Sequence, residues 1–530
     1  MNMSSLVRLQ TPIAPVLDNL FLDTYWFFCP NRLLWDDWTS FMGENTNAWK
    51  QTTVYQVPQL RIGGASTTAN NNKVDKNSLC NYMGIPIGLG GIASNDANLE
   101  AKTIKVNALP FRAYCKIWND WFRDTSTQKE LYFPRNATTV SSVSKKIADS
   151  TTDHYTQLCY RGGACAKANK FHDVFTSCLP EPQEGPETLV PIIGDGRLKW
   201  GMSYSPGDQS SDSEYVKVNN VYGEYAGLKV NDLLETNAML MPDHDEAATS
   251  SPIGLGTVSN MATELMLDVE HAIGASISAL RMAYSIQRYY ESTARGGNRY
   301  IEQIQSHFGV TNPDFRLQRS EYLGGATRIP ISINQVLQTA PSNTAPVGWT
   351  GAYSVTSDVS EDMWTHSFTE HGILMCLAVA RTDHTYQQGI AKKFFRKDLF
   401  DYYWPELANI SEQPVYTKEI FAEDGDTSKI EQNETVFGYQ EAYSEYRYEK
   451  DIVSGELSSM YSTPLDIWHY ADYYSTAPTL NEEWMRETDV NVKRTLANQT
   501  QDQFLADFYI KGTWTRPMPL YSIPGMQGHY

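Results

Sequence analysis

The sequence lacks any long hydrophobic run. No stretch reaches the ~20 consecutive apolar residues that a helix needs to cross a bilayer, and the first residues do not follow the pattern of a signal peptide. Cysteine is scarce as well, because 7 thiols are scattered over 530 residues, an odd number that does not suit a disulfide framework. We therefore expect reduced thiols, assembly in a cytoplasm and no membrane insertion.

Positive charge is also in short supply. The chain has 43 Lys and Arg against 62 Asp and Glu, which gives a formal net charge of −19. A protein that neutralises nucleic-acid phosphates by itself normally has a basic excess, because its cations displace the phosphate counterions. If this chain surrounds nucleic acid, we expect a separate basic peptide, polyamines or metal ions to supply most of the neutralisation.

Motifs for catalysis and phosphate binding are incomplete. No Gly-x-Ser-x-Gly is present to place a nucleophile near His371 or His384. A core or interface histidine is the better interpretation of both. The glycine-rich stretches at 88–91 and 295–297 do not continue into Gly-Lys-Ser/Thr, so we interpret them as turns. The sequence predicts no catalytic residue and no cofactor.

One group of residues has the side chains of a zinc site. Cys159, Cys165, His172 and Cys178 are separated by gaps of five, six and five residues. Structural zinc sites usually contain Cys pairs only two to four residues apart. We therefore favour buried or incidental thiols over a metal site.

Aromatic residues, by contrast, are abundant, with 32 Tyr, 19 Phe and 13 Trp. Tyr and Trp provide large rigid surfaces at low conformational cost and are favoured in contacts between chains. Aromatic residues also favour strands. The composition therefore leaves open whether they serve assembly or a β-rich core.

Apolar and aromatic runs predict strands at both ends of the chain. The predicted strands are 20–28, 54–60, 372–380 and 504–514. The third is continuously apolar, which predicts a strand buried on both faces. Strands at both ends with helices and long loops between them predict a β-sandwich with large excursions.

Helical spacing of apolar residues predicts two helices. The first covers 111–123, where aromatic residues recur along one face. The second has Ile273, Ile277, Leu280 and Tyr284 on one face and ends at 295–297, since Gly is common just past a helix C-terminus.

Residues 186–261 differ in composition from the rest, because Pro, Gly, Ser, Asp and Asn dominate them. A structureless loop longer than ~15 residues is uncommon in a compact domain, so we predict an inserted subdomain or a functional projection. The chain then divides into 1–185, 186–261 and 262–530. The candidates for an apolar cluster on this projection are Tyr222, Tyr225, Leu240 and Met241.

Four arginines lie close together in this net-acidic chain. Arg is favoured in buried interfaces because its planar guanidinium binds carboxylate or phosphate through two parallel hydrogen bonds. We expect them at a subunit interface or facing a genome, with subunit or internal salt bridges favoured over phosphates. The four are Arg295, Arg299, Arg316 and Arg319.

Several longer motifs occur in order along the chain. They are Tyr-Trp-Phe-Phe-Cys-Pro-Asn-Arg at 25–32, Leu-Pro-Phe-Arg-Ala-Tyr at 109–114, Ala-Arg-Gly-Gly-Asn-Arg-Tyr at 294–300, Arg-Leu-Gln-Arg-Ser-Glu-Tyr-Leu-Gly-Gly at 316–325, Tyr-Gln-Gln-Gly at 386–389 and Arg-Pro-Met-Pro-Leu-Tyr-Ser-Ile-Pro-Gly at 516–525. Together they resemble the major capsid proteins of the Microviridae, the small single-stranded DNA phages, and most of all the gokushovirus branch.

The resemblance implies a mainly β fold, an eight-stranded viral jelly-roll β-sandwich with long helix- and loop-containing insertions. It implies a non-enzymatic coat subunit that self-assembles into a T=1 icosahedral capsid of the virion. This shell packages circular single-stranded DNA with a small basic DNA-binding packaging protein. In relatives a further stretch precedes the region of residues 2–12.

The resemblance also implies that the insertion at 186–261 forms a protrusion at the threefold axes and contacts a host-cell receptor. A receptor- or carbohydrate-binding β-sandwich protein, such as a phage spike, is the alternative function. A glycoside hydrolase is a more distant one, since it needs two carboxylates about 5–10 Å apart in a cleft.

Overall fold

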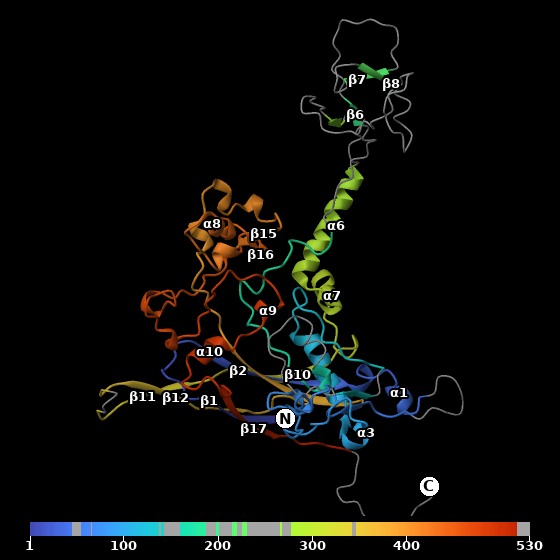
Figure 1. Cartoon of the computed structure of the whole chain (residues 1–530), viewed down its shortest axis with the longest axis vertical. Helices are drawn as coiled ribbons and strands as arrows, with labels where there is room; N and C mark the ends of the chain where they lie inside the picture. The colour runs from blue at the N-terminus through green and yellow to red at the C-terminus, as the bar shows by residue number, and fades with distance from the viewer. Residues whose placement is uncertain are drawn as a thin grey trace, which may run out of the picture. The chain divides into compact units, whose positions relative to one another are not determined.

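The computed structural model describes most of the chain. The described residues are 1–44, 55–64, 66–136, 139–141, 159–186, 198–200, 215–219, 225–229, 265–267, 277–341 and 346–516. The chain divides into two compact units, Met1–Glu187 with Gln287–Tyr530 in the first and Thr188–Ile286 in the second. The first unit contains the two larger sheets (Figure 1).

The first large sheet is built around the N-terminal strand. Strand β1 (Asn2–Leu9) lies between β13 (Thr356–Ser360) and β17 (Phe504–Lys511), and both neighbours are antiparallel to it. Alternate residues of β1 are buried, which fits a strand with one face toward the core. The strand predicted at 504–514 is therefore confirmed, although it ends at Lys511.

The second large sheet is built around β2 (Leu20–Pro30). It pairs antiparallel with β10 (Glu321–Pro330) and β14 (Gly372–Thr382). The strands predicted at 20–28 and 372–380 are confirmed. Burial on both faces was the wrong prediction for β14, because β14 is an outer strand of this sheet and most of its residues are partly exposed.

The two large sheets contribute to one core. Val7 of β1, Leu22 of β2 and Ile329 of β10 belong to a single buried cluster, against which Phe504 and Phe508 of β17 pack. Side chains from both large sheets therefore fill a common interior. The described part of the chain is β-rich, built mostly of small antiparallel sheets with helices between them.

The helix predicted at 111–123 is confirmed. Helix α4 (Leu109–Ile117) continues into one π-helical turn, η3 (Trp118–Phe122). The ring of Phe27 on β2 lies 5.7 Å from the rings of Trp121 and Phe122. Three of the family-like motifs meet here, because Leu109 and Ala113 of α4 belong to the same buried cluster as Phe27. In addition, Trp121 Nε1 donates to the Ser320 carbonyl beside β10, at 2.9 Å.

The second predicted helix is also confirmed within the described residues. Helix α6 (Ile277–Gly296) ends where the glycines predicted it, and Gly297 has a φ of +95°. Ile273 lies outside the described residues. A second helix, α7 (Tyr300–Phe308), follows directly.

The remaining elements are short. The strand predicted at 54–60 is mostly wrong, because of its described residues, 55–60, only Gln59 and Leu60 belong to a strand. The other strands are β3 (Gln59–Arg61), β4 (Lys105–Asn107), β5 (Thr139–Ser141), β6 (Leu198–Trp200), β7 (Tyr215–Asn219), β8 (Tyr225–Lys229), β9 (Leu265–Leu267), β11 (Ile333–Leu337), β12 (Thr350–Ser354), β15 (Glu412–Tyr416) and β16 (Val436–Glu441). The other helices are α1 (Trp38–Phe41), α2 (Leu79–Tyr82), α3 (Leu99–Lys102), α8 (Thr427–Asn433), α9 (Glu482–Met485) and α10 (Val490–Arg494).

Two small antiparallel pairs belong to the second unit, β6 with β9 and β7 with β8. Within the described ranges, we find no helix that combines the length and the apolar character required to span a bilayer.

Candidate functional site

Arg299 holds the start of α7 against the end of η3. Its backbone N–H and its guanidinium both contact Glu302, at 3.1 and 2.9 Å. Its Nη2 donates to the carbonyl oxygens of Asn119, at 3.2 Å, and Arg123, at 2.5 Å. Carbonyls at a helix end have no partner within the helix, so Arg299 satisfies groups that the π-helical turn leaves free.

Arg319 acts on the same turn from another segment. Its Nη2 donates to the carbonyl oxygen of Asp120, and its guanidinium carbon lies 4.6 Å from the ring centroid of Trp121. The Asp120 carboxylate in turn accepts hydrogen bonds from the backbone N–H and the hydroxyl of Ser320, both at 2.9 Å. Two of the four candidate arginines therefore contact η3. Arg299 joins the start of α7 to it, and Arg319 joins the segment before β10 to it.

The other two candidates are more exposed. Arg295, in the last turn of α6, forms an ion pair with the buried carboxylate of Glu412. Burial raises the pKa of Glu412, although Arg295 counteracts this rise. Arg316 is exposed and forms no ion pair with another described residue. A contact of these four arginines with a neighbouring subunit or a genome stays a prediction.

A recess of about 740 Å³ is lined by two of these arginines, Arg295 and Arg299. Four arginines and four acidic residues line it, and most of them pair with each other. Arg299 contacts Glu302, Arg295 contacts Glu412, and the exposed Arg447 contacts Glu441. The charged lining consists of Arg123, Asp124, Arg295, Arg299, Glu302, Glu412, Glu441 and Arg447. Because its positive charges are already balanced, the recess does not resemble a phosphate site.

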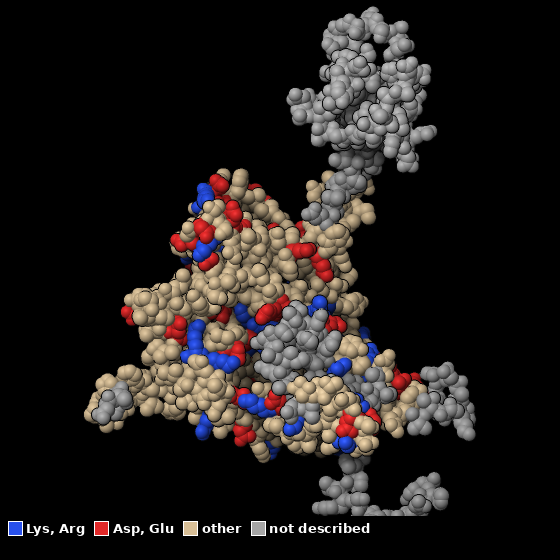
Figure 2. Space-filling view, in the orientation of Figure 1, with Lys and Arg blue, Asp and Glu red and all other residues tan. Residues whose placement is uncertain are grey.

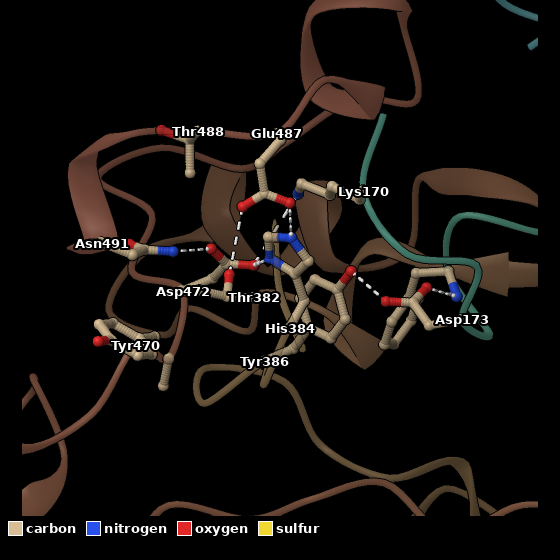
Figure 3. Close-up of polar contacts among 12 residues, drawn as sticks. Lys170, Asp173, Thr382, His384, Tyr386, Tyr470, Asp472, Glu487, Thr488 and Asn491 are labelled. Atoms are coloured by element: carbon tan, nitrogen blue, oxygen red, sulfur yellow. Dashed lines mark hydrogen bonds and ion pairs between the residues drawn. The ribbon is translucent and has the colours of Figure 1, made fainter. Parts of the chain in front are cut away.

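A buried ion-pair centre surrounds His384, just after β14 (Figure 3). The imidazole lies between two carboxylates, with Nδ1 2.8 Å from Asp472 Oδ2 and Nε2 3.0 Å from Glu487 Oε2. Thr382 Oγ1 donates to the second oxygen of Glu487 at 3.2 Å, and Asn491 donates to Asp472. The His384 side chain is fully buried.

Electrostatics at this centre favour the charged imidazolium. Burial alone would lower the pKa of His384, but Asp472 and Glu487 outweigh it and raise the pKa to about 9. Burial likewise acts to raise the pKa of Asp472, yet His384 and Lys170 lower it to about 2. Lys170 lies 3.9 Å from Asp472 and 4.2 Å from the Trp484 ring centroid, and burial lowers its pKa. Tyr386 faces the same centre and donates to Asp173 at 2.6 Å.

The geometry of this centre fits a structural role. Both imidazole nitrogens are held by carboxylates, so neither is free to accept a proton from a substrate. Of the two alternatives, a core or an interface histidine, the core is confirmed for His384. His371 is exposed, so an interface position for it stays a prediction. Asp383, the sequence neighbour of His384, instead contacts Arg328 at 3.4 Å. Sequence reasoning missed the true partners because they lie 88 and 103 residues away.

The four residues of the possible zinc pattern are distributed over different parts of the fold. Cys159 and Cys165 belong to one buried cluster with aromatic residues, and Cys178 belongs to another. Burial raises the pKa of Cys165 to about 11, which disfavours the thiolate that zinc requires. Across the part of the chain that the structure describes, no group of three or more potential ligands is arranged to hold a metal ion.

The candidates for the protrusion belong to the second unit. Tyr225 begins β8 and pairs with Asn219 of β7. Tyr222, Leu240 and Met241 lie outside the described residues. The apolar cluster proposed for these side chains stays a prediction.

Replacing Arg319 tests the contact between η3 and the segment before β10. We expect Arg319→Lys to lower the free energy of unfolding by about 1–2 kcal/mol, because the stacking on Trp121 and the fixed carbonyl hydrogen bond are lost. The matched variant Arg316→Lys should stay within about 0.5 kcal/mol, since Arg316 is exposed. Urea unfolding of the purified subunit measures both, and equal effects would contradict a specific role of Arg319.

Replacing His384 tests the ion-pair centre through pH. A pKa raised to about 9 gives stability that is complete below about pH 6.5 and lost as the pH rises through 9. We therefore expect the parent to lose about 3 kcal/mol between pH 6.5 and 9. His384→Gln should be less stable at pH 6.5 and should lack most of this loss.

The exposed His371→Gln serves as the control and should retain the pH dependence of the parent. Thermal unfolding followed by circular dichroism across this pH range measures all three proteins. If His384→Gln and the parent lose stability in parallel as the pH rises, His384 is not charged in the folded protein.

Comparison with known proteins agrees with the motifs. Residues 1–526 match the family described as capsid protein (F protein). Capsid protein VP1 of Spiroplasma virus 4 is 36% identical over 99% of this chain and 89% of its own length. Capsid protein VP1 of Chlamydia phage 1 is 34% identical over 98% of this chain and 89% of its own length. Capsid protein VP1 of Bdellovibrio phage phiMH2K is 34% identical over 100% of this chain and 90% of its own length.

These relatives all come from Microviridae, so the resemblance found in the motifs is confirmed. The match covers both ends of the chain and the segments that carry β2, α4 and β10. The chain belongs to the Microviridae capsid protein (F protein) family, and it is a capsid protein of phage virions.

Proposed function

We propose that this capsid protein assembles with copies of itself into a closed T=1 icosahedral shell around circular single-stranded DNA. The match to the capsid family over residues 1–526 is the observation that carries the proposal. A coat subunit needs a rigid body that presents contacts in fixed directions. The shared core of the two large sheets supplies such a body.

The core of each subunit is an eight-stranded jelly roll in this proposal. Two three-stranded antiparallel sheets with one common core support it, because a jelly roll consists of two facing sheets. Residues 1–185 and 262–530 supply the core, and residues 186–261 form the insertion. The separate compact unit Thr188–Ile286 supports this division.

The coat subunit binds its genome weakly and packages it with a small basic protein. The net charge of −19 supports this proposal, because phosphate binding needs a local excess of cations. The contacts of Arg295, Arg299 and Arg319 within the chain support it further, since their positive charges are already engaged.

The insertion at 186–261 projects outward, makes threefold-related contacts with its copies and contacts a host-cell receptor. Its turn-rich composition supports this role, because loops on a rigid scaffold are where recognition usually lies. Its membership in a separate compact unit fits a segment that can vary without disturbing the core.

Assembly and DNA binding can be measured on the same preparation. We expect the purified protein to form closed particles of uniform size in electron micrographs. At physiological salt its affinity for a circular single-stranded DNA should stay in the range of about 1–100 μM. Adding a short Lys- and Arg-rich peptide should raise the DNA retained on filters and make it fall steeply with salt.

An uncharged peptide of the same length is the control and should change nothing. A protein that never forms closed particles would contradict the proposed shell. Nanomolar binding of DNA without any peptide would contradict the need for a basic partner.

A deletion of residues 186–261 tests the insertion. We expect the shortened protein to retain the unfolding temperature of the core, because the two large sheets lie outside the deleted segment. Its particles should bind host cells at least about ten-fold less than parent particles, as expected when a main recognition surface is lost. Host attachment equal to that of the parent would show that the insertion has no receptor role.

A further inference from the structure

The β11–β12 hairpin extends sideways from the large sheets as a two-stranded arm (Figure 1). Its base is anchored, since Ile331 and Ser354 are buried and Ser354 Oγ donates to the Ser332 carbonyl at 2.8 Å. Beyond this base the strands pair only with each other in the described chain, from Ile333↔Ser354 to Leu337↔Thr350. An isolated two-stranded hairpin is at best marginally stable in water.

The exposed aromatic residues of this arm lie on one face, which also carries Asn334 and Gln338. Residues directly opposite each other in an antiparallel pair point to the same face, and Val336 lies opposite Gly351 while Asn334 lies opposite Tyr353. The pairing continues past the strands, where the Gln338 N–H donates to the Trp349 carbonyl at 2.8 Å. Val336, Trp349 and Tyr353 therefore share one face, and they are 49%, 59% and 51% exposed.

The arm also has no charge. From Ile329 to Ser357 the sequence contains no Asp, Glu, Lys, Arg or His, although charged residues make up 20% of the chain. In Figure 2 the outer end of the arm, at the left, shows tan surface without Lys, Arg, Asp or Glu atoms. Exposed surface normally carries charges, whereas the centres of interfaces lose charge and gain Tyr and Trp.

We propose that the face bearing Val336, Trp349 and Tyr353 packs against a neighbouring copy of this chain in the shell. The inference rests on the proposed shell and names one of its contacts. A nucleic acid is the wrong occupant, because the arm offers no cation to a phosphate. A second copy fits, since a capsid protein is surrounded by its own copies and an uncharged face avoids their mutual repulsion at −19 each.

In this proposal the arm packs against a surface of the neighbour other than the neighbour's own arm, which makes the contact head-to-tail. Such head-to-tail contacts close into rings when the rotation between copies allows it. In this way the arm contributes both to holding subunits together and to setting their arrangement.

Charge placed on the face of Trp349 tests the contact. We expect Trp349→Lys to raise the subunit concentration needed for particle formation at least about ten-fold, as for an aromatic residue at the centre of an interface. Sedimentation of particles against free subunits measures this concentration. The unfolding temperature of the free subunit, measured in parallel, separates assembly from folding.

Two glutamines, Gln335 in β11 and Gln338 just after it, provide a matched control. Gln338→Glu adds a charge on the face of Trp349, whereas Gln335→Glu adds the same charge on the opposite face. We expect only Gln338→Glu to weaken assembly, and this pair decides the case if Trp349→Lys does not fold.

Particle formation by Trp349→Lys or Gln338→Glu at the parent's concentration would overturn the proposed contact while leaving the shell itself intact. So would normal particles that lose only DNA or host binding, because another partner would then occupy the face. A parent protein that forms no closed particles would instead overturn the proposed function.

Discussion

Strand β2 is the constraint on which the rest of the fold depends. It pairs with β10 and β14, whose residues lie roughly 300 or more positions later in the sequence, as in Phe28↔Glu321 and Pro30↔Gly372. Contacts between such distant segments require loop closure before they contribute stability. The aromatic side chains of β2, packed on α4 and η3, offset that entropic cost with buried apolar area. The long segments between β2, β10 and β14 can therefore form the helices, loops and small sheets that lie outside this sheet.

Several cations of this acidic chain form ion pairs or hydrogen bonds inside the subunit, whereas the β11–β12 arm carries no charge. His384, just after β14, pairs with Asp472 and Glu487 and so joins the end of this strand to two later segments. Lys170 lies beside the same Asp472 carboxylate. Arg299 and Arg319 tie α7 and β10 to η3. These four cations therefore stabilise the subunit itself. The uncharged β11–β12 arm then remains as the surface suited to contacts between identical acidic copies.

The sequence predicted the elements whose patterns are local. The aromatic run of β2 ends at Pro30, and the helical spacing that leads to Gly297 marks α6. Strand β1 was not predicted, because Ser5 is 5% exposed while Leu6 is 38% exposed, the reverse of their polarity. The ion-pair centre was missed because Asp472 and Glu487 reach His384 only through tertiary packing. The family motifs indicated a capsid protein well before any of these contacts could be known.

Hydrogen exchange of the free subunit tests most directly whether the paired central strands organise the chain. We expect the amides of β1 and β2 to exchange slowest and together, because both strands are paired on both sides and line a common core. The amides of the two-stranded β15–β16 pair should exchange faster. If β2 exchanged as fast as β15–β16, or apart from β14 and β10, the fold would depend on another part of the chain.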